Sequence, residues 1–132
     1  MPLPVTAVFA GILGLWLIYL QMQVGRQRRT KGILLGSGGD ADCERTIRAH
    51  GNATETIPIF LILMAAGESL ATPVWVLAVL GAVFTLGRFL HGVHFLRNSP
   101  GLRLRFWGMI MTVLATALMA LGAIGHGLGS ML

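Results

Sequence analysis

The chain has 132 residues, of which 55% are hydrophobic and only 11% are charged. Its mean hydropathy is +0.75. Soluble domains carry roughly a quarter charged residues, so this composition predicts an integral membrane protein with a single domain, residues 1–132. The net charge of +5 does not indicate nucleic-acid binding, because all ten Lys and Arg residues lie within positions 26–48 and 88–105. The one cysteine, Cys43, excludes an internal disulfide and is expected in a loop.

The first predicted helix covers residues 4–25, a stretch of apolar and uncharged side chains. At about 1.5 Å per residue, such a length spans a bilayer core. No basic segment precedes it, so we expect a retained membrane helix rather than a cleaved signal peptide. The basic segment 26–31 is expected to end the helix, and the glycine-rich residues 36–42 are expected to form a loop.

The second helix is expected to begin near residue 43 or 44, with Asp42 as its N-cap, and to end near residue 67. Pro58 lies inside it and is expected to kink it. The third helix is predicted over residues 73–96, before a break at 98–101, and the fourth from about 102–105 to about 124. Residues 125–132 are expected to fray. Trp75 and Trp107 are predicted to lie at opposite membrane interfaces.

The basic residues predict the orientation. In a bundle of four antiparallel helices the first and third loops lie on one side, and all Lys and Arg residues fall in or beside those loops. The positive-inside rule therefore places both loops in the cytoplasm and both termini outside.

The second helix carries the most informative pattern. Arg48, Asn52 and Glu55 stand at i, i+4 and i+7, so they share one helix face. Polar and charged side chains are costly inside a membrane and usually mark a functional site. An arginine beside a carboxylate and an amide fits an anionic ligand that also carries an amine. The alternative is a buried network in which Glu55 only neutralises Arg48 or Arg88.

The other helices are expected to bring further polar groups to the same depth. These are Arg26 and Arg28 from the first helix, Arg88, His91 and His94 from the third, and Arg103 and Arg105 from the fourth. The four histidines lack metal-ligand spacing, so no metal site is predicted.

The segment ERTIRAHGNATETIPIFLIL resembles the signature of the MAPEG family, the membrane-associated proteins in eicosanoid and glutathione metabolism. The signature is an Arg-x-x-x-Asn-x-x-Glu face followed by a proline. GRFLHGVHF in the third helix and RLRFWGM at the start of the fourth extend the resemblance over essentially the whole chain.

This resemblance implies a left-handed, up-down bundle of four transmembrane helices that assembles as a homotrimer. It also implies glutathione as co-substrate, bound between subunits near the cytoplasmic side. Arg48 would bind a carboxylate of glutathione, Asn52 its peptide portion and Glu55 its amine. Further lining positions matched by the resemblance are His50, Arg88, His91 and Phe95.

The family's thiolate-stabilising arginine lies at the start of the fourth helix. Arg103 and Arg105 both lie near that position, and we favour Arg105. Arg26 or Arg28 would supply a second arginine. The chain departs from the family at Thr56, where an aromatic residue is usual, and in the third helix, which carries no tyrosine.

The function implied is a membrane-bound, bacterial-type glutathione transferase or peroxidase that acts on lipophilic electrophiles from the bilayer of the inner membrane. One alternative is a non-catalytic trimeric membrane protein that binds lipid or a partner. The other is a small four-helix transporter, against which the arginines at the level of Glu55 argue.

Overall fold

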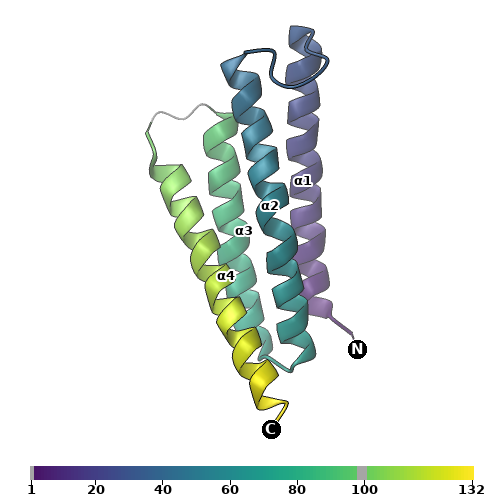
Figure 1. Ribbon diagram of the computed structural model, residues 1–132, viewed down its shortest axis with the longest axis vertical. Coiled ribbons are helices and arrows are strands. Elements are labelled where there is room, and N and C mark those ends of the chain that lie inside the picture. The colour runs from purple at the N-terminus through teal and green to yellow at the C-terminus, as the bar shows by residue number, and fades with distance from the viewer. Residues whose placement is uncertain (1, 98–100) are drawn as a thin grey trace.

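A computed structural model describes residues 2–97 and 101–132 as four α-helices (Figure 1). The helices are α1 (Pro4–Lys31), α2 (Ala41–Ser69), α3 (Val74–Leu96) and α4 (Arg103–Gly129). They run alternately up and down, so the α1–α2 connection lies at one end of the bundle and the α2–α3 turn at the other. The predicted all-α bundle of four helices is confirmed.

Within the described residues, α1, α3 and α4 are long and apolar enough to cross a membrane. Their outward faces carry large aliphatic side chains such as Leu15 and Leu121, which are 70% and 66% exposed and fit a lipid environment. The chain is therefore a multi-pass membrane protein. The second helix is as long as the others but does not reach the same hydropathy, because its first half contains charged and polar residues.

The first helix is longer than predicted. The basic segment 26–31 does not end it but forms its last turns, and the helix stops at Gly32, which adopts a left-handed conformation (φ 66°). Arginine and lysine are good helix formers and favour a helix C-terminus. A glycine with positive φ is a much stronger stop signal than a cluster of charges.

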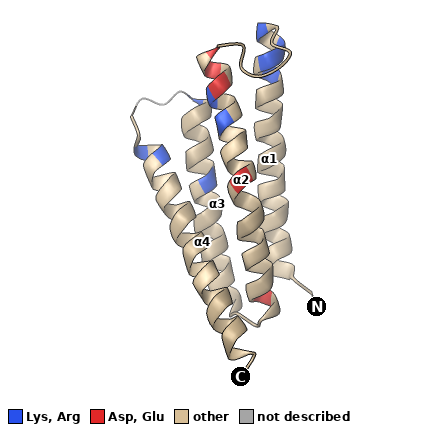
Figure 2. Cartoon of the chain, viewed as in Figure 1, with Lys and Arg blue, Asp and Glu red and all other residues tan. Residues whose placement is uncertain are grey.

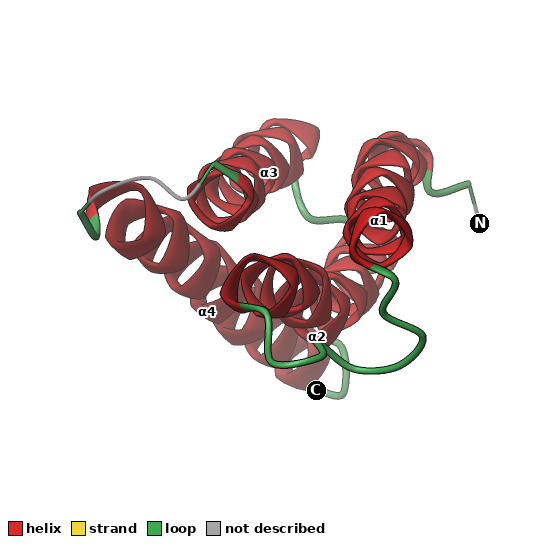
Figure 3. Cartoon of the chain, turned by 90° about the horizontal axis from the view of Figure 1, so that it is seen from above, coloured by secondary structure: helices red, strands yellow, loops and turns green. Residues whose placement is uncertain are grey.

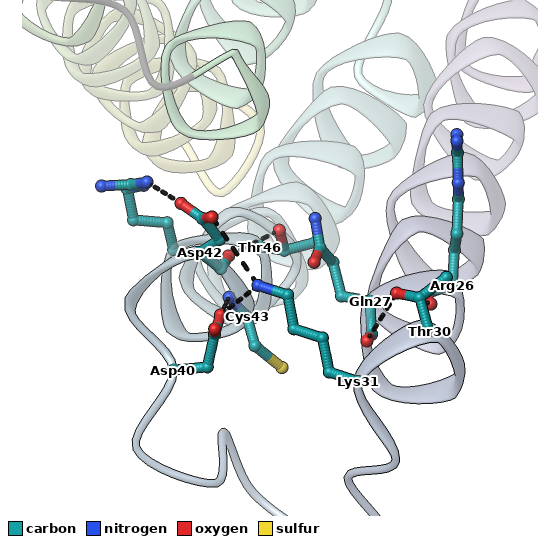
Figure 4. A network of polar contacts seen from close by, with 9 residues as sticks. Arg26, Gln27, Thr30, Lys31, Asp40, Asp42, Cys43 and Thr46 are labelled. Atoms are coloured by element: carbon teal, nitrogen blue, oxygen red, sulfur yellow. Dashed lines mark hydrogen bonds and ion pairs between the residues drawn. The ribbon is translucent and has the colours of Figure 1, made fainter.

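The start of α2 also differs from the prediction. Its N-cap is Asp40, not Asp42, and the Asp40 carboxylate accepts a hydrogen bond from the backbone N–H of Cys43 at 2.8 Å. Lys31 at the end of α1 donates to the same carboxylate, so this contact ties α1 to α2 (Figure 4). The expectation of a loop cysteine was wrong, because Cys43 lies fully buried in the first turn of α2.

The helices continue further than predicted at the opposite end. The second helix passes through Pro58 and ends at Ser69, so Glu68 belongs to its last turn. The tail expected to fray is helical up to Gly129. The predicted break at 98–101 falls mostly on residues 98–100, which lie outside the described residues.

The α2 and α3 helices lie between α1 and α4 and pack on each other through aromatic rings. Phe60 of α2 stacks on Phe84 of α3 with ring centroids 3.8 Å apart. Seen from above, α1 and α4 lie on opposite sides of the bundle (Figure 3). The described parts of α1 and α4 do not pack on each other, and both pack on α2 and α3.

Glycines set the closest approaches to α3. A Cβ on Gly108 of α4 would lie 2.7 Å from the carbonyl oxygen of Gly87 and 2.8 Å from the backbone nitrogen of His91. Small residues allow two membrane helices to touch through their backbones in this way. On the other side of α3, Gly92 makes room for the indole of Trp16, to which a Cβ would come within 2.5 Å.

Candidate functional site

Basic residues from all four helices gather at the end of the bundle that carries the α1–α2 connection (Figure 2). The acidic residues at this end lie at the start of α2, where Asp40 and Asp42 pair with Lys31 and Arg45. These ion pairs hold the connection in place. The predicted site residues take no part in these ion pairs.

The predicted face of α2 points away from the core. Arg48 and Glu55 are exposed, and Asn52 between them is half-buried. Within the described residues, neither Arg48 nor Glu55 forms an ion pair. The alternative in which Glu55 neutralises Arg48 or Arg88 is therefore wrong for the single chain, and two charges remain on the outside of a membrane bundle.

Arg88 lies inside the bundle and is only 1% exposed. Its Nη1 atom donates hydrogen bonds of 2.8 Å to Oδ1 of Asn52 and to Oγ1 of Thr56. Both acceptors are neutral, and no carboxylate among the described residues pairs with the guanidinium. A buried cation that meets only neutral acceptors favours an anion nearby.

Thr56 is the residue that the sequence did not assign to the site. Its hydroxyl donates to the carbonyl oxygen of Asn52 at 2.9 Å and accepts from Arg88. It therefore holds Arg88 at the position where the resemblance led us to expect an aromatic side chain. The sequence did contain one indication of this role, because Thr56 follows Asn52 by one helical turn and so lies on the same side of α2.

Three other predicted residues meet where α3 faces α4. His91 is buried, and its ring lies 5.1 Å from that of Phe95. The guanidinium of Arg105 lies 5.5 Å from the centre of the Phe95 ring, within the range of a cation–π contact. Phe95 thus orients Arg105, the arginine that we favoured, from the side of α3.

The remaining predicted residues lie at the edge of this cluster. Arg103 is the first residue of α4 and is exposed. Arg28 donates from Nε to the carbonyl oxygen of Gly36 at 3.1 Å, which fixes the α1–α2 loop. Arg26 points away from the polar network of that loop (Figure 4). His50 is half-buried, and its carbonyl oxygen accepts from Thr54.

The arrangement has consequences for ligand chemistry. Arg88 donates to Oδ1 of Asn52, so the two N–H groups of the Asn52 amide remain free for a ligand, together with the second lone pair of Oδ1. Beside it, Arg48 offers donors for an anion and Glu55 offers an acceptor for a cation. The α2 face therefore suits a ligand with an anionic group, a peptide-type carbonyl and an amine.

Comparisons with known proteins show which sequences this chain resembles. The sequence model of the MAPEG family matches residues 6–125. The chain is also similar to the inner membrane protein YecN of Escherichia coli strain K12, with 34% identity over 116 residues that cover 84% of this chain and 88% of YecN. YecN of E. coli O6:H1 shows the same identity and coverage.

Proposed function

Because the chain belongs to the MAPEG family, we propose that it binds glutathione, or a related anionic thiol, on the outer face of α2. It would use the thiol on lipophilic electrophiles that enter from the bilayer. The observation that carries this proposal is the pair of exposed charges, Arg48 and Glu55, on a helix whose inner side holds Arg88 and Asn52 together. Charges at such a position are costly unless a ligand or a second subunit covers them.

Each group of glutathione has a partner on this face. Its carboxylates suit the forked donors of Arg48, and its γ-glutamyl ammonium suits Glu55. The N–H groups of Asn52 would donate to a peptide carbonyl oxygen, while its Oδ1 atom accepts from Arg88. The buried charge of Arg88 adds to the positive potential around the bound anion.

The chemical step needs a thiolate. A thiol with a pKa of about 8.5 is mostly protonated at neutral pH, and a nearby guanidinium favours the anion. Arg105 is the first candidate because Phe95 already orients it, and Arg103 is the second. The thiolate sulfur would bond to the electrophilic carbon, and the leaving group would depart with the bonding electrons.

We further propose a homotrimer in the inner membrane, with α2 crossing the bilayer as the fourth span. The α2 helix lies antiparallel to α1 and returns the chain to the end where α3 begins, which supports a fourth crossing (Figure 1). A neighbouring copy would cover Arg48, Glu55 and His50, and Arg26 or Arg28 of one copy would complete the site of another. The positive-inside rule supports cytoplasmic loops at the basic end.

Thermal unfolding of the detergent-solubilised protein with glutathione tests the binding step. A ligand at a hundred times its Kd stabilises the folded state by about 2.7 kcal/mol, so the midpoint should rise with glutathione concentration. Glu55→Gln should raise the apparent KM for glutathione about tenfold, as expected for loss of a charged hydrogen bond. Arg29→Gln, which removes an exposed charge at the same end, is the matched control.

Turnover of a generic electrophile tests the chemical step. Arg105→Ala should lower kcat at least a hundredfold, the usual effect of losing a group that stabilises developing charge. A larger loss in Arg103→Ala would assign the thiolate to Arg103 instead. Glutathione binding without turnover in the wild-type protein would indicate the non-catalytic alternative. A wild-type protein that glutathione does not stabilise would contradict the proposal altogether.

A further inference from the structure

We propose a second binding site, inside the bundle between α1, α2 and α3, for the acid group of an anionic amphiphile. The class includes fatty acids and anionic phospholipids. The site differs from the outer face of α2, because Arg48, Asn52 and Glu55 do not line it.

A cavity of about 280 Å³ lies between α1, the first turns of α2 and the last turns of α3. A second cavity of about 240 Å³ adjoins it and shares Gln27, Thr46, Leu96 and Arg97 with it. Together they reach the lower range of small-molecule sites, about 300–1,000 Å³.

The side chains that line the cavity are aromatic at its deep end and polar toward its mouth. Trp16, Gln23 and Gln27 lie on one side of α1 and line it from its deep end to its mouth. At about 1.5 Å per residue, this stretch of helix is on the order of 16 Å long. The deep end is aromatic, because Trp16 stacks on Tyr19 with ring centroids 5.4 Å apart. The occupant should therefore be elongated, with an apolar part beside the two rings.

The polar groups of the lining differ between the deep end and the mouth of the cavity. The indole Nε1 of Trp16 is buried and finds no acceptor among the described residues. The hydroxyl proton of Thr46 is already donated to the carbonyl oxygen of Asp42 at 2.9 Å. Gln27 extends from α1 toward Thr46, so its amide lies at the mouth (Figure 4). The Gln27 amide therefore offers N–H donors to an acid group bound at the mouth.

The charge at the mouth is positive. Arg45 and Asp42, which both line the second cavity, pair with each other. Arg97, which lines both cavities, then leaves a net positive charge at the entrance. An acid group bound between Gln27 and Arg97 would satisfy this charge, and its apolar chain would extend toward Trp16.

Fluorescence quenching on the full chain tests this site. Trp75→Phe and Trp107→Phe together leave Trp16 as the only tryptophan, and both replaced side chains are exposed. We expect 12-bromododecanoate to quench Trp16 saturably, because its bromine reaches the deep end. The 2-bromo isomer, with its bromine at the mouth, should quench less. The neutral 12-bromododecanol should bind at least tenfold more weakly, because it lacks the charge that Arg97 recognises.

Variants separate the site from general surface charge. Arg97→Gln should weaken binding of 12-bromododecanoate about tenfold, whereas Arg29→Gln, a charge at the same end but outside the cavity, should not. Equal effects of the two variants, or equal binding of acid and alcohol, would overturn the proposal. A loss of binding in Glu55→Gln but not in Arg97→Gln would place the amphiphile on α2 and would also overturn it.

Lipid composition separates the two sources of the acid group. In nanodiscs of phosphatidylglycerol, an anionic phospholipid that occupies the cavity would compete with 12-bromododecanoate and raise its apparent Kd. The same Kd in phosphatidylglycerol and phosphatidylcholine nanodiscs would assign the cavity to free fatty acids. Either result supports the site if Arg97→Gln raises the Kd for the saturable quenching about tenfold.

Discussion

Glu55 and Glu68 lie on the same helix but in opposite situations. The Glu68 carboxylate accepts hydrogen bonds from the backbone N–H groups of Val5 at 2.9 Å and Thr6 at 2.8 Å, so it caps the first turn of α1. Glu55 is exposed and pairs with no described residue. A carboxylate whose acceptors are used within the chain supports the fold, whereas one that is left exposed is available to a ligand or a second subunit.

Replacement of the buried cation, Arg88, should have the largest effect on stability. Arg88→Ala removes a large buried side chain and leaves the oxygens of Asn52 and Thr56 without their donor. We expect the free energy of unfolding to fall by about 3 kcal/mol, as for other large-to-small changes in cores. Unfolding in mixed micelles with increasing dodecyl sulfate measures it. Arg103→Ala, an exposed arginine, is the control and should change stability little.

Truncating each of the two glutamates in turn separates their roles. Glu68→Ala should destabilise the protein by about 1 kcal/mol, the usual effect of losing a helix cap, and should leave stabilisation by glutathione intact. Glu55→Ala should leave the unfolding free energy of the ligand-free protein within about 0.5 kcal/mol and lower the stabilisation by glutathione by about 1.4 kcal/mol, the equivalent of a tenfold loss of affinity. The same unfolding measurement with and without glutathione reads both effects. Equal destabilisation by the two variants would contradict the division of roles.

The smallest expected effect concerns pH at the α1–α2 connection. The hydrogen bond from Lys31 lowers the pKa of the Asp40 carboxyl below its ordinary value. The ionised form is thus favoured by folding, and its contribution is present above the unfolded pKa of about 3.9 and lost as the pH falls through the lower folded pKa. Thermal midpoints from pH 7 to pH 3 should therefore drop less in Asp40→Asn, which keeps an N-cap oxygen without the charge. If the thermal midpoint fell equally in the wild-type protein and in Asp40→Asn, ionisation of Asp40 would not contribute to the pH dependence of stability.

Much of the fold could be predicted because long apolar stretches and their breaks are local properties. The exact helix ends were harder to predict from the sequence. The end of α1 depends on the left-handed conformation of Gly32, and the cap of α2 depends on the bond from the Cys43 backbone N–H to the Asp40 carboxylate. The sequence shows closely spaced acidic residues around the start of α2 but not which of them lies just ahead of its first turn.

The candidate site also contains features that the sequence could predict and features that it could not. The shared face of Arg48 and Glu55 follows from helical spacing alone, and the structure shows both on the outside of α2. The link from Arg88 to Thr56 joins residues 32 positions apart and depends on how α2 lies against α3. Spacing within one helix contains no information about that contact, so Thr56 was recognised only as a departure from a family pattern.

The contact between Gly87 and Gly108 has a consequence for the positions of two arginines. These glycines lie one residue before Arg88 and three residues after Arg105, so the backbones that carry the two arginines touch directly. Side chains can rotate to suit a ligand, but backbones in contact cannot approach further. The Cα atoms that carry the two arginines are therefore held at nearly fixed positions. A methyl group at Gly108 would push the backbones of α3 and α4 apart and would shift Arg105 relative to Arg88.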